Sequence, residues 1–146
     1  MRNFFRYPKA AAVTPAIVDP SASHAADGHA TDRYFEHKAA RLRYRDAGSG
    51  PAVVLVHGWT LDLEMWDLQA AALQSGWRVV RYDRRGFGRS SGRPSTEQDC
   101  EDLVALCDHL ALARVALVGM SQGVRPVLQW AASTPRRVAC LVACTN

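Results

Sequence analysis

The sequence predicts an α/β fold built on a doubly wound, mostly parallel sheet, and two observations predict it. First, short continuous runs of apolar residues alternate along the chain with segments in which apolar residues recur at helical spacing. Second, the links between these segments are short and carry the glycine, proline and aspartate that are typical of turns. Continuous apolar runs are typical of strands covered on both faces, and strands that alternate with helices form parallel sheets.

Four apolar runs are predicted to be buried strands. A preceding segment, residues 34–46, differs from them because its polar and apolar residues alternate loosely. It ends in the turn-forming residues 46–51, so we expect an early strand or hairpin there. The four predicted buried strands are Ala52–Val56, Trp77–Tyr82, Val115–Met120 and Val138–Cys144.

Three helices are predicted between these strands. Asp62 is a suitable N-cap for the first helix, and Gly76 is expected to stop it. Ser95 followed by Gln98 has the spacing of a capping box, which predicts the start of the second helix. The third helix follows the strand that ends at Met120. The apolar stripes of the three helices fall within residues 63–73, 100–110 and 122–133.

The chain divides near residue 32. Residues 1–32 are rich in Ala, Pro, Ser and His without a sustained period, so we expect a flexible tail in front of a folded domain at 33–146. A secretory signal is the alternative, with Ala10–Val18 as a short apolar core and Ser23–Ala25 as a cleavage site. That core lacks Leu and Phe, which favours the tail.

Composition excludes several classes of protein. The 146 residues suffice for one domain with a sizeable core, and a hydrophobic fraction of 48% excludes disorder throughout. The apolar runs are far shorter than the ~20 residues of a membrane-spanning helix, so no membrane partner is expected. The four cysteines form no C-x-x-C pair and lie in apolar stretches. We therefore expect buried free thiols and a reduced, cytoplasmic environment.

Charge and glycine spacing exclude two further kinds of site. The group of arginines between Arg81 and Arg93 lacks the regularly spaced aromatic residues of a nucleic-acid surface, so we expect a solvated, partly salt-bridged loop and no nucleic-acid partner. The glycines at 86, 88 and 92 do not complete G-x-G-x-x-G, because Ser91 stands at the third position. No dinucleotide site is predicted, and we expect neither a cofactor nor a metal.

The strongest motif is Gly119-Met120-Ser121-Gln122-Gly123, a G-x-S-x-G between a predicted strand and a predicted helix. A strand that turns sharply into a helix forces its central residue into a strained, exposed conformation, and the small flanking residues let strand, turn and helix approach closely. The hydroxyl of Ser121 would then project near a helix N-terminus, which favours developing negative charge. The context therefore predicts that Ser121 is a nucleophile.

Three segments together resemble the α/β-hydrolase family. Besides the G-x-S-x-G, His57-Gly58-Trp59 follows a predicted strand and resembles the family's oxyanion loop. The stretch Tyr82–Ser90 resembles its D-x-R-G-x-G-x-S loop. The resemblance covers residues 34–146 and implies a serine nucleophile. Dehalogenases and epoxide hydrolases of this fold carry Asp at the position of Ser121, so the serine argues against those two groups of enzymes.

The resemblance implies specific roles. Ser121 would be the nucleophile, and the backbone N–H groups of Trp59 and Gln122 would form the oxyanion hole that stabilises a tetrahedral acyl intermediate. His57 is expected to orient the oxyanion turn instead of acting as the general base. Asp83 is expected to anchor its loop through nearby arginines instead of acting as the acid of the triad.

The acid and base of a catalytic triad are missing after the predicted nucleophile. Residues 122–146 contain no Asp, Glu or His, whereas the family places both partners after the serine. The resemblance thus implies the amino-terminal half of a serine hydrolase, and we expect this chain to lack efficient turnover. The strand at 138–144 would present an unpaired apolar edge, which predicts self-association. Val124 and Pro126 depart from the family pattern and predict a distorted first helical turn or a poorer elbow.

The leading functional prediction is a serine hydrolase that acts on a carboxylic ester or lactone through an acyl-serine intermediate. A cofactor-free haloperoxidase or perhydrolase is the alternative within the same fold, because Tyr82–Ser91 is similar to those enzymes and peroxide would replace water as acyl acceptor. A non-catalytic hydrolase remnant is the alternative of a different class. The expected partner is a small-molecule ester, lactone or peracid-type substrate.

Overall fold

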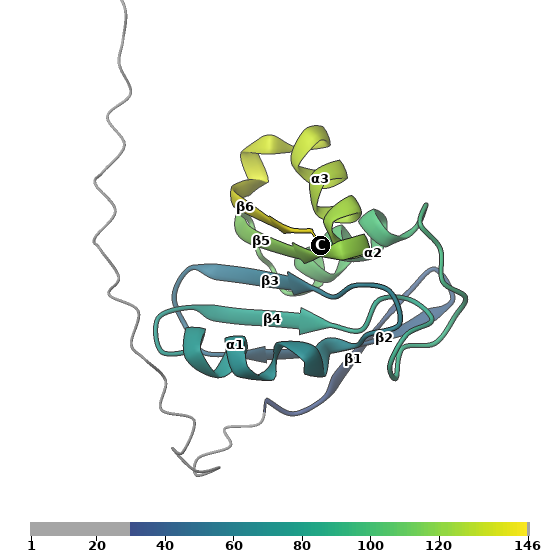
Figure 1. The fold of residues 1–146 in the computed structure, drawn as a ribbon, viewed down its shortest axis with the longest axis horizontal. Coiled ribbons are helices and arrows are strands. Elements are labelled where there is room, and N and C mark those ends of the chain that lie inside the picture. Colours follow the sequence, from purple (N-terminus) through teal and green to yellow (C-terminus); the bar gives the residue numbers. More distant parts are fainter. Residues whose placement is uncertain (1–29, 146) are drawn as a thin grey trace, which may run out of the picture.

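The computed structural model describes residues 30–145, which form a six-stranded sheet with helices on both faces (Figure 1). Residues 1–29 and 146 lie outside the described range, and with them nearly all of the predicted tail and the segment of the alternative secretory signal. The strands are β1 Arg33–His37, β2 Ala40–Ala47, β3 Ala52–Val56, β4 Arg78–Tyr82, β5 Val115–Met120 and β6 Val138–Cys144. Every predicted strand is therefore present, and residues 34–46 form a hairpin.

The strand order is β1-β2-β4-β3-β5-β6. β2 pairs antiparallel with β1 and with β4, whereas β4, β3, β5 and β6 are parallel to their neighbours. The chain passes from β3 to β4 in one direction and then crosses back over β3 to reach β5. This reversal is a topological switch point, and open α/β sheets bind ligands outside the carboxyl ends of the strands at such a point.

Helices cover both faces of the sheet. The first helical segment consists of the 3-10 helix η1 (Leu63–Trp66) and α1 (Asp67–Leu73). It lies on one face, where Trp66 and Ala70 join the side chains of β3 and β4 in one apolar cluster. The helices α2 (Asp99–His109) and α3 (Val124–Ser133) lie on the other face, where Leu103 and Trp130 belong to the larger cluster. The predicted doubly wound α/β class is confirmed.

Local signals in the sequence place the helix ends. The Asp62 carboxylate accepts a hydrogen bond from Glu64 N at 2.8 Å, which confirms the predicted N-cap. Ser95 Oγ accepts from Gln98 N at 3.2 Å, although residues 96–98 form a turn and the α-helix begins at Asp99. Pro126 lies in the first turn of α3, where backbone N–H groups have no partner within a helix, so the proline costs no hydrogen bond.

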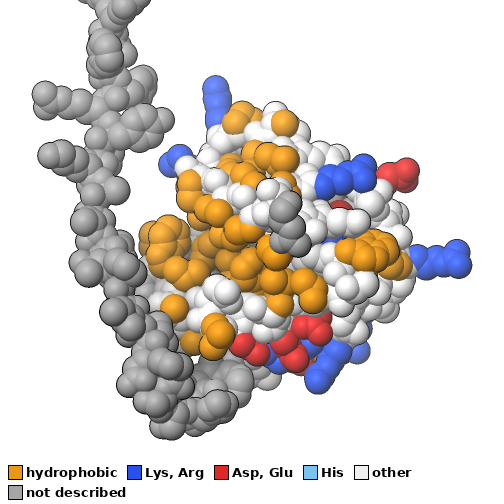
Figure 2. All heavy atoms as spheres, viewed as in Figure 1, with side chains coloured by type: hydrophobic (Ala, Val, Ile, Leu, Met, Phe, Trp, Pro, Cys, Tyr) orange, Lys and Arg blue, Asp and Glu red, His pale blue; other side chains and the backbone are white. Residues whose placement is uncertain are grey.

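The prediction that Val138–Cys144 is a buried strand was wrong. The segment forms β6, but four of its seven residues are exposed, including Val142 at 48%. The parallel register with β5 puts Cys140 and Val142 on the side of the sheet where α1 lies. α1 packs over β3 and β4, and Figure 2 shows hydrophobic side chains gathered on the remainder of that face.

The prediction of a solvated arginine loop was also wrong in part. Arg81, Arg84 and Arg85 are at most 6% exposed. Arg84 pairs with Asp99 and Arg85 with Asp102, both on α2. Two carboxylates on one helix thus neutralise two neighbouring guanidinium groups, which lets them be buried together.

The cysteine prediction holds for two of the four residues. All four thiols are free, and Cys100 and Cys107 are buried, but Cys140 is exposed and Cys144 is half-buried on β6. Burial raises the pKa of the Cys107 thiol to about 12, so this thiol stays protonated and unreactive. Within residues 30–145, none of the helices is long and apolar enough to cross a bilayer.

Candidate active site

The motif residues gather where β3 and β5 end, at the switch point of the sheet. The two strands run parallel, with Val56 opposite Gly119, so their carboxyl ends lie at the same edge (Figure 1). The loop that follows β3 carries His57, Gly58 and Trp59. Ser121 follows β5 directly. The sheet thus brings together two segments that are more than sixty positions apart in the sequence.

Ser121 occupies a strained turn at the surface. Its φ angle is +50°, a left-handed conformation that residues with a side chain rarely adopt. It begins a one-turn 3-10 helix, η2 (Ser121–Gly123), which joins β5 to α3, and it is exposed. Gln122 is the next residue and is exposed as well. This is the geometry expected of a strand-to-helix elbow that presents a hydroxyl.

The two glycines of the motif have a packing role that the structure makes explicit. A Cβ on Gly119 would lie 2.6 Å from the carbonyl oxygen of Gly123 and 2.8 Å from Val124 Cα. A Cβ on Gly123 would lie 2.5 Å from the carbonyl oxygens of both Val56 and His57. Neither position has room for a side chain. The second contact also packs the elbow directly against the start of the 57–62 loop.

The loop after β3 passes beside Ser121. The position that a Cβ would take on Gly58 lies 3.3 Å from Ser121 Cβ and 3.6 Å from Leu61 Cδ1. Trp59 follows, half-exposed at 46%, with its ring 4.9 Å from that of Phe87. Within residues 30–145, no protein acceptor takes the backbone N–H of Trp59. A donor without a partner is what a developing oxyanion requires.

His57 is engaged at both ring nitrogens and has no side-chain partner in the described chain. Arg84 N donates to Nε2 at 2.8 Å, so Nε2 carries a lone pair and the ring proton is on Nδ1. Nδ1 then donates to the carbonyl oxygen of Gly58 at 2.7 Å. The imidazole is fully buried, and this burial lowers its pKa. The neutral ring links two loops by hydrogen bonds and is not directed at the Ser121 hydroxyl.

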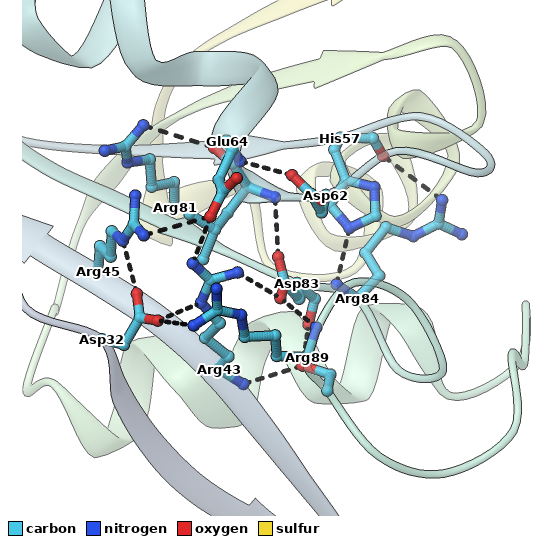
Figure 3. Close-up of polar contacts among 12 residues, drawn as sticks. Asp32, Arg43, Arg45, His57, Asp62, Glu64, Arg81, Asp83, Arg84 and Arg89 are labelled. Carbon is cyan, nitrogen blue, oxygen red and sulfur yellow. Dashed lines mark hydrogen bonds and ion pairs between the residues drawn. The ribbon is translucent and has the colours of Figure 1, made fainter.

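Asp83 anchors the two loops to each other (Figure 3). Its fully buried carboxylate accepts from Leu63 N at 2.8 Å and from Arg89 N at 2.7 Å. Arg43 Nη1 donates to the same group at 3.3 Å. The backbone donors come from the start of η1 and from the loop after β4, so one carboxylate fixes the spacing of both segments. Asp83 is therefore an anchor for these loops, as its sequence context predicted.

The sequence did not predict the network of ion pairs that surrounds Asp83. Arg43 is 1% exposed and also donates to Glu64 Oε1 at 2.8 Å (Figure 3). This bond holds the pKa of Glu64 below its ordinary value. The network unites four guanidinium groups with four carboxylates, namely Arg43, Arg45, Arg81 and Arg89 with Asp32, Glu64, Asp67 and Asp83. The one available signal was the presence of arginines within the alternating segment 34–46.

The described chain brings no general base to Ser121. Besides His57, the structure describes His37, which bonds to Asp102, and His109, which stacks on Phe35. Across residues 30–145 there is also no group of three His, Cys, Asp or Glu side chains that could hold a metal ion. The site as described can therefore present a hydroxyl and backbone N–H donors to a carbonyl group, but it lacks a side chain that would accept the proton.

Comparisons with known proteins agree with this fold. Residues 51–146 match the family model of the alpha/beta hydrolase fold. A crystal structure of a hydrolase from Pseudomonas aeruginosa superimposes with a TM-score of 0.73 at 32% identity, over 81% of this chain and 46% of that chain. An epoxide hydrolase from Vigna radiata gives a TM-score of 0.72 at 28% identity, over 77% of this chain and 39% of that chain.

Two curated relatives extend the comparison. The non-heme haloperoxidase of Rhodococcus erythropolis is 39% identical over 93 residues, which are 61% of this chain and 34% of the relative. Bifunctional epoxide hydrolase 2 of Sus scrofa is 35% identical over 134 residues, which are 87% of this chain and 23% of the relative. This chain thus spans about a third or less of the length of these relatives.

The fold and the loops at its switch point define an α/β protein of the hydrolase type. The chain belongs to the alpha/beta hydrolase fold family. The resemblance that three short segments implied is confirmed at the level of the family and the fold.

Proposed function

We propose that this chain carries the nucleophile and the oxyanion donors of a serine hydrolase that acts on a carboxylic ester or lactone. The observation that carries the proposal is the position of Ser121, exposed at φ +50° beside the glycine that precedes Trp59. In the proposed step a base takes the Ser121 hydroxyl proton while Oγ attacks the carbonyl carbon, and the Trp59 and Gln122 N–H groups donate to the carbonyl oxygen. The bond from the carbonyl carbon to the alkoxy oxygen then breaks, and that oxygen takes up the proton, as a free alcohol from an ester or as a hydroxyl of the opened ring from a lactone. The serine argues against epoxide hydrolysis, because the resemblance implies Asp at this position in epoxide hydrolases.

The side chains around Ser121 favour an apolar group on the substrate. Leu61 and Trp59 are 40% and 46% exposed, and both lie in the loop that passes the serine. Phe87 packs against Trp59 from the loop after β4. Exposed apolar side chains beside a polar reacting centre are typical of small-molecule sites. A small ester or lactone with an apolar acyl group fits these surroundings.

The test supplies the missing base from solution. The protein is incubated with p-nitrophenyl acetate and imidazole, and peptide mapping measures acetylation of Ser121. Imidazole takes the hydroxyl proton, the Oγ–acyl bond forms, and p-nitrophenolate leaves. We expect acetyl-Ser121 to form and to require imidazole. Acetylation is measured on the protein because imidazole cleaves the ester by itself.

Two variants make this test specific. Ser121→Ala removes the proposed nucleophile and should abolish the labelled peptide. Ser133→Ala is the matched control, because Ser133 lies at the end of α3 and, among the described residues, its hydroxyl bonds only the Trp130 carbonyl. Acetylation that is unchanged in Ser121→Ala would overturn the proposal, and rapid ester turnover by the chain without imidazole would refute the expectation of inefficient catalysis.

A haloperoxidase or perhydrolase is the second candidate. It is favoured by the relative named a non-heme haloperoxidase and uses the same acyl-serine step, with peroxide as the acyl acceptor. Comparison of peracetic acid with acetic acid release from acetyl-Ser121 in the presence of peroxide separates the two functions. A protein that is not acylated at all is the outcome expected of a non-catalytic hydrolase remnant.

A further inference from the structure

Arg43 is a buried guanidinium that lies outside the stretch matched by the family model. It belongs to β2, and its two terminal nitrogens donate to different carboxylates, Nη1 to Asp83 Oδ2 at 3.3 Å and Nη2 to Glu64 Oε1 at 2.8 Å. Its Nε lies 2.9 Å from Asp32 Oδ2 without hydrogen-bond geometry. Because a guanidinium is a rigid planar fork, Arg43 fixes the separation of the carboxylates that it bridges.

Both bridged carboxylates hold the residues that directly follow the 57–62 loop. Asp83 Oδ1 accepts from Leu63 N at 2.8 Å, and Glu64 is the next residue along the chain. The loop begins at His57, which is bonded to Arg84 N. One end of the loop is therefore held by the imidazole, and the other end is held by Arg43 through Asp83 and Glu64.

A side-chain bond to the buried Asp83 distinguishes Arg43 from the other arginines of the network, because Arg81 is also buried but pairs with Asp67. Arg43 and Asp83 are 1% and 0% exposed, whereas the Arg89 side chain is 64% exposed. Charge interactions are strongest where water is excluded. Arg45 is the closest match, since it bonds to Asp32 at 2.6 Å and to Glu64 at 3.4 Å. Within the described chain, however, Arg45 makes no bond to Asp83.

We propose that Arg43 is a positioning residue for reaction at Ser121, which it serves by holding the 57–62 loop so that the Trp59 N–H faces the substrate oxygen. The inference rests on the proposed function. Arg43 touches neither the serine nor the substrate, and it acts through the two carboxylates. β2, which precedes the residues matched by the family model, thus helps to position the 57–62 loop.

The test compares Arg43→Met with Arg45→Met. The amide resonance of Trp59 and its rate of hydrogen exchange measure the conformation and opening of the 57–62 loop. Imidazole-dependent acetylation measures the reactivity of Ser121. In Arg43→Met we expect a shifted Trp59 resonance, faster exchange and acetylation reduced tenfold or more, since loss of one oxyanion donor costs about 10²–10³ in rate. Arg45→Met removes ion pairs from the same network, including a longer one to Glu64, but leaves Asp83 paired, so it should change both readouts much less than Arg43→Met does.

A conservative variant keeps the test decisive. Arg43→Lys retains the charge without the fork, so we expect acetylation between that of the unmodified protein and that of Arg43→Met, even if Arg43→Met does not fold. Unchanged Trp59 resonance and acetylation in Arg43→Lys and in folded Arg43→Met would overturn the proposal, as would equal effects of the Arg45→Met change. Failure of the unmodified protein to acetylate Ser121 refutes the proposed function instead, while the Trp59 resonance still reports whether Arg43 holds the loop.

Discussion

His57 is a neutral imidazole between two loops, and this state has a consequence for the pH dependence of stability. Burial lowers its pKa in the folded protein, so between that value and the unfolded value of about 6.5 the unfolded chain binds more protons. Stability is therefore retained above pH 6.5 and lost as the pH falls toward the folded pKa. A proton on Nε2 would also face the N–H of Arg84.

The measurement is the free energy of unfolding at pH 7.5 and at pH 5.5, from urea denaturation. We expect a loss of up to about 1.4 kcal/mol for each pH unit below 6.5 from this group. His57→Gln should be less stable at pH 7.5 and should lack this part of the slope. His109→Gln is the matched control and should keep it. Equal slopes in the unmodified protein and His57→Gln would contradict the assignment.

Single residues show what a sequence can and cannot reveal about this site. Ser121, Gln122 and Trp59 could be singled out because each lies at a fixed offset within a short motif next to a strand. Arg43 could not, since its partners at 64 and 83 become neighbours only when β2 pairs with β4. The burial of Arg84 escaped for the same reason, because its partner Asp99 lies on a helix that packs against the loop. Ion pairing of this kind is a property of the tertiary structure.

At the scale of elements, the elbow depends on close backbone packing at Gly123. Gly123→Ala would put a methyl group 2.5 Å from the carbonyl oxygens of Val56 and His57. We expect a loss of about 1–3 kcal/mol, or more if the backbone cannot shift. Gly76→Ala is the matched control, because a Cβ there meets nothing within 4 Å, and it should stay within about 0.5 kcal/mol. Chemical denaturation measures both, and equal stability would contradict the packing described.

The elements also show why the strands were easier to predict than their burial. Apolar runs located the four parallel strands, alternation predicted a strand or hairpin where β1 and β2 lie, and turn residues located the strand ends to within a few positions. Burial depends on what lies beside and above a strand, which local sequence does not encode. β6 has the composition of a central strand, but in the described chain it is an edge strand. Its side chains on the face of the sheet where α1 lies are partly exposed to solvent.

At the scale of the whole molecule, β6 is an edge strand of the sheet without charged residues. It contains no charged residue or proline, whereas the opposite edge, β1, carries Arg33 and Glu36. Charges and prolines are what normally protect edge strands from pairing with another chain. We therefore expect this chain to self-associate through β6. Sedimentation velocity at several concentrations measures the state of assembly.

A charge on the edge should prevent this assembly. Val142→Lys introduces an ammonium on β6 and should shift the protein toward monomer. Leu128→Lys is the matched control, since Leu128 is 51% exposed on α3, on the other face of the sheet, and should not change the assembly. Monomeric behaviour of the unmodified protein at all concentrations would contradict association through this edge.

The proposed function requires the Ser121 hydroxyl and the Trp59 and Gln122 amides to converge on one carbonyl group, the hydroxyl on its carbon and the amides on its oxygen. The most direct measurement is a titration with benzeneboronic acid followed by amide NMR, because boron binds a serine oxygen and forms a tetrahedral adduct. We predict downfield shifts of the Trp59 and Gln122 amide protons, absent in Ser121→Ala. An adduct on Ser121 that leaves both amide resonances unshifted, or equal shifts in Ser121→Ala, would contradict the convergence of these three groups.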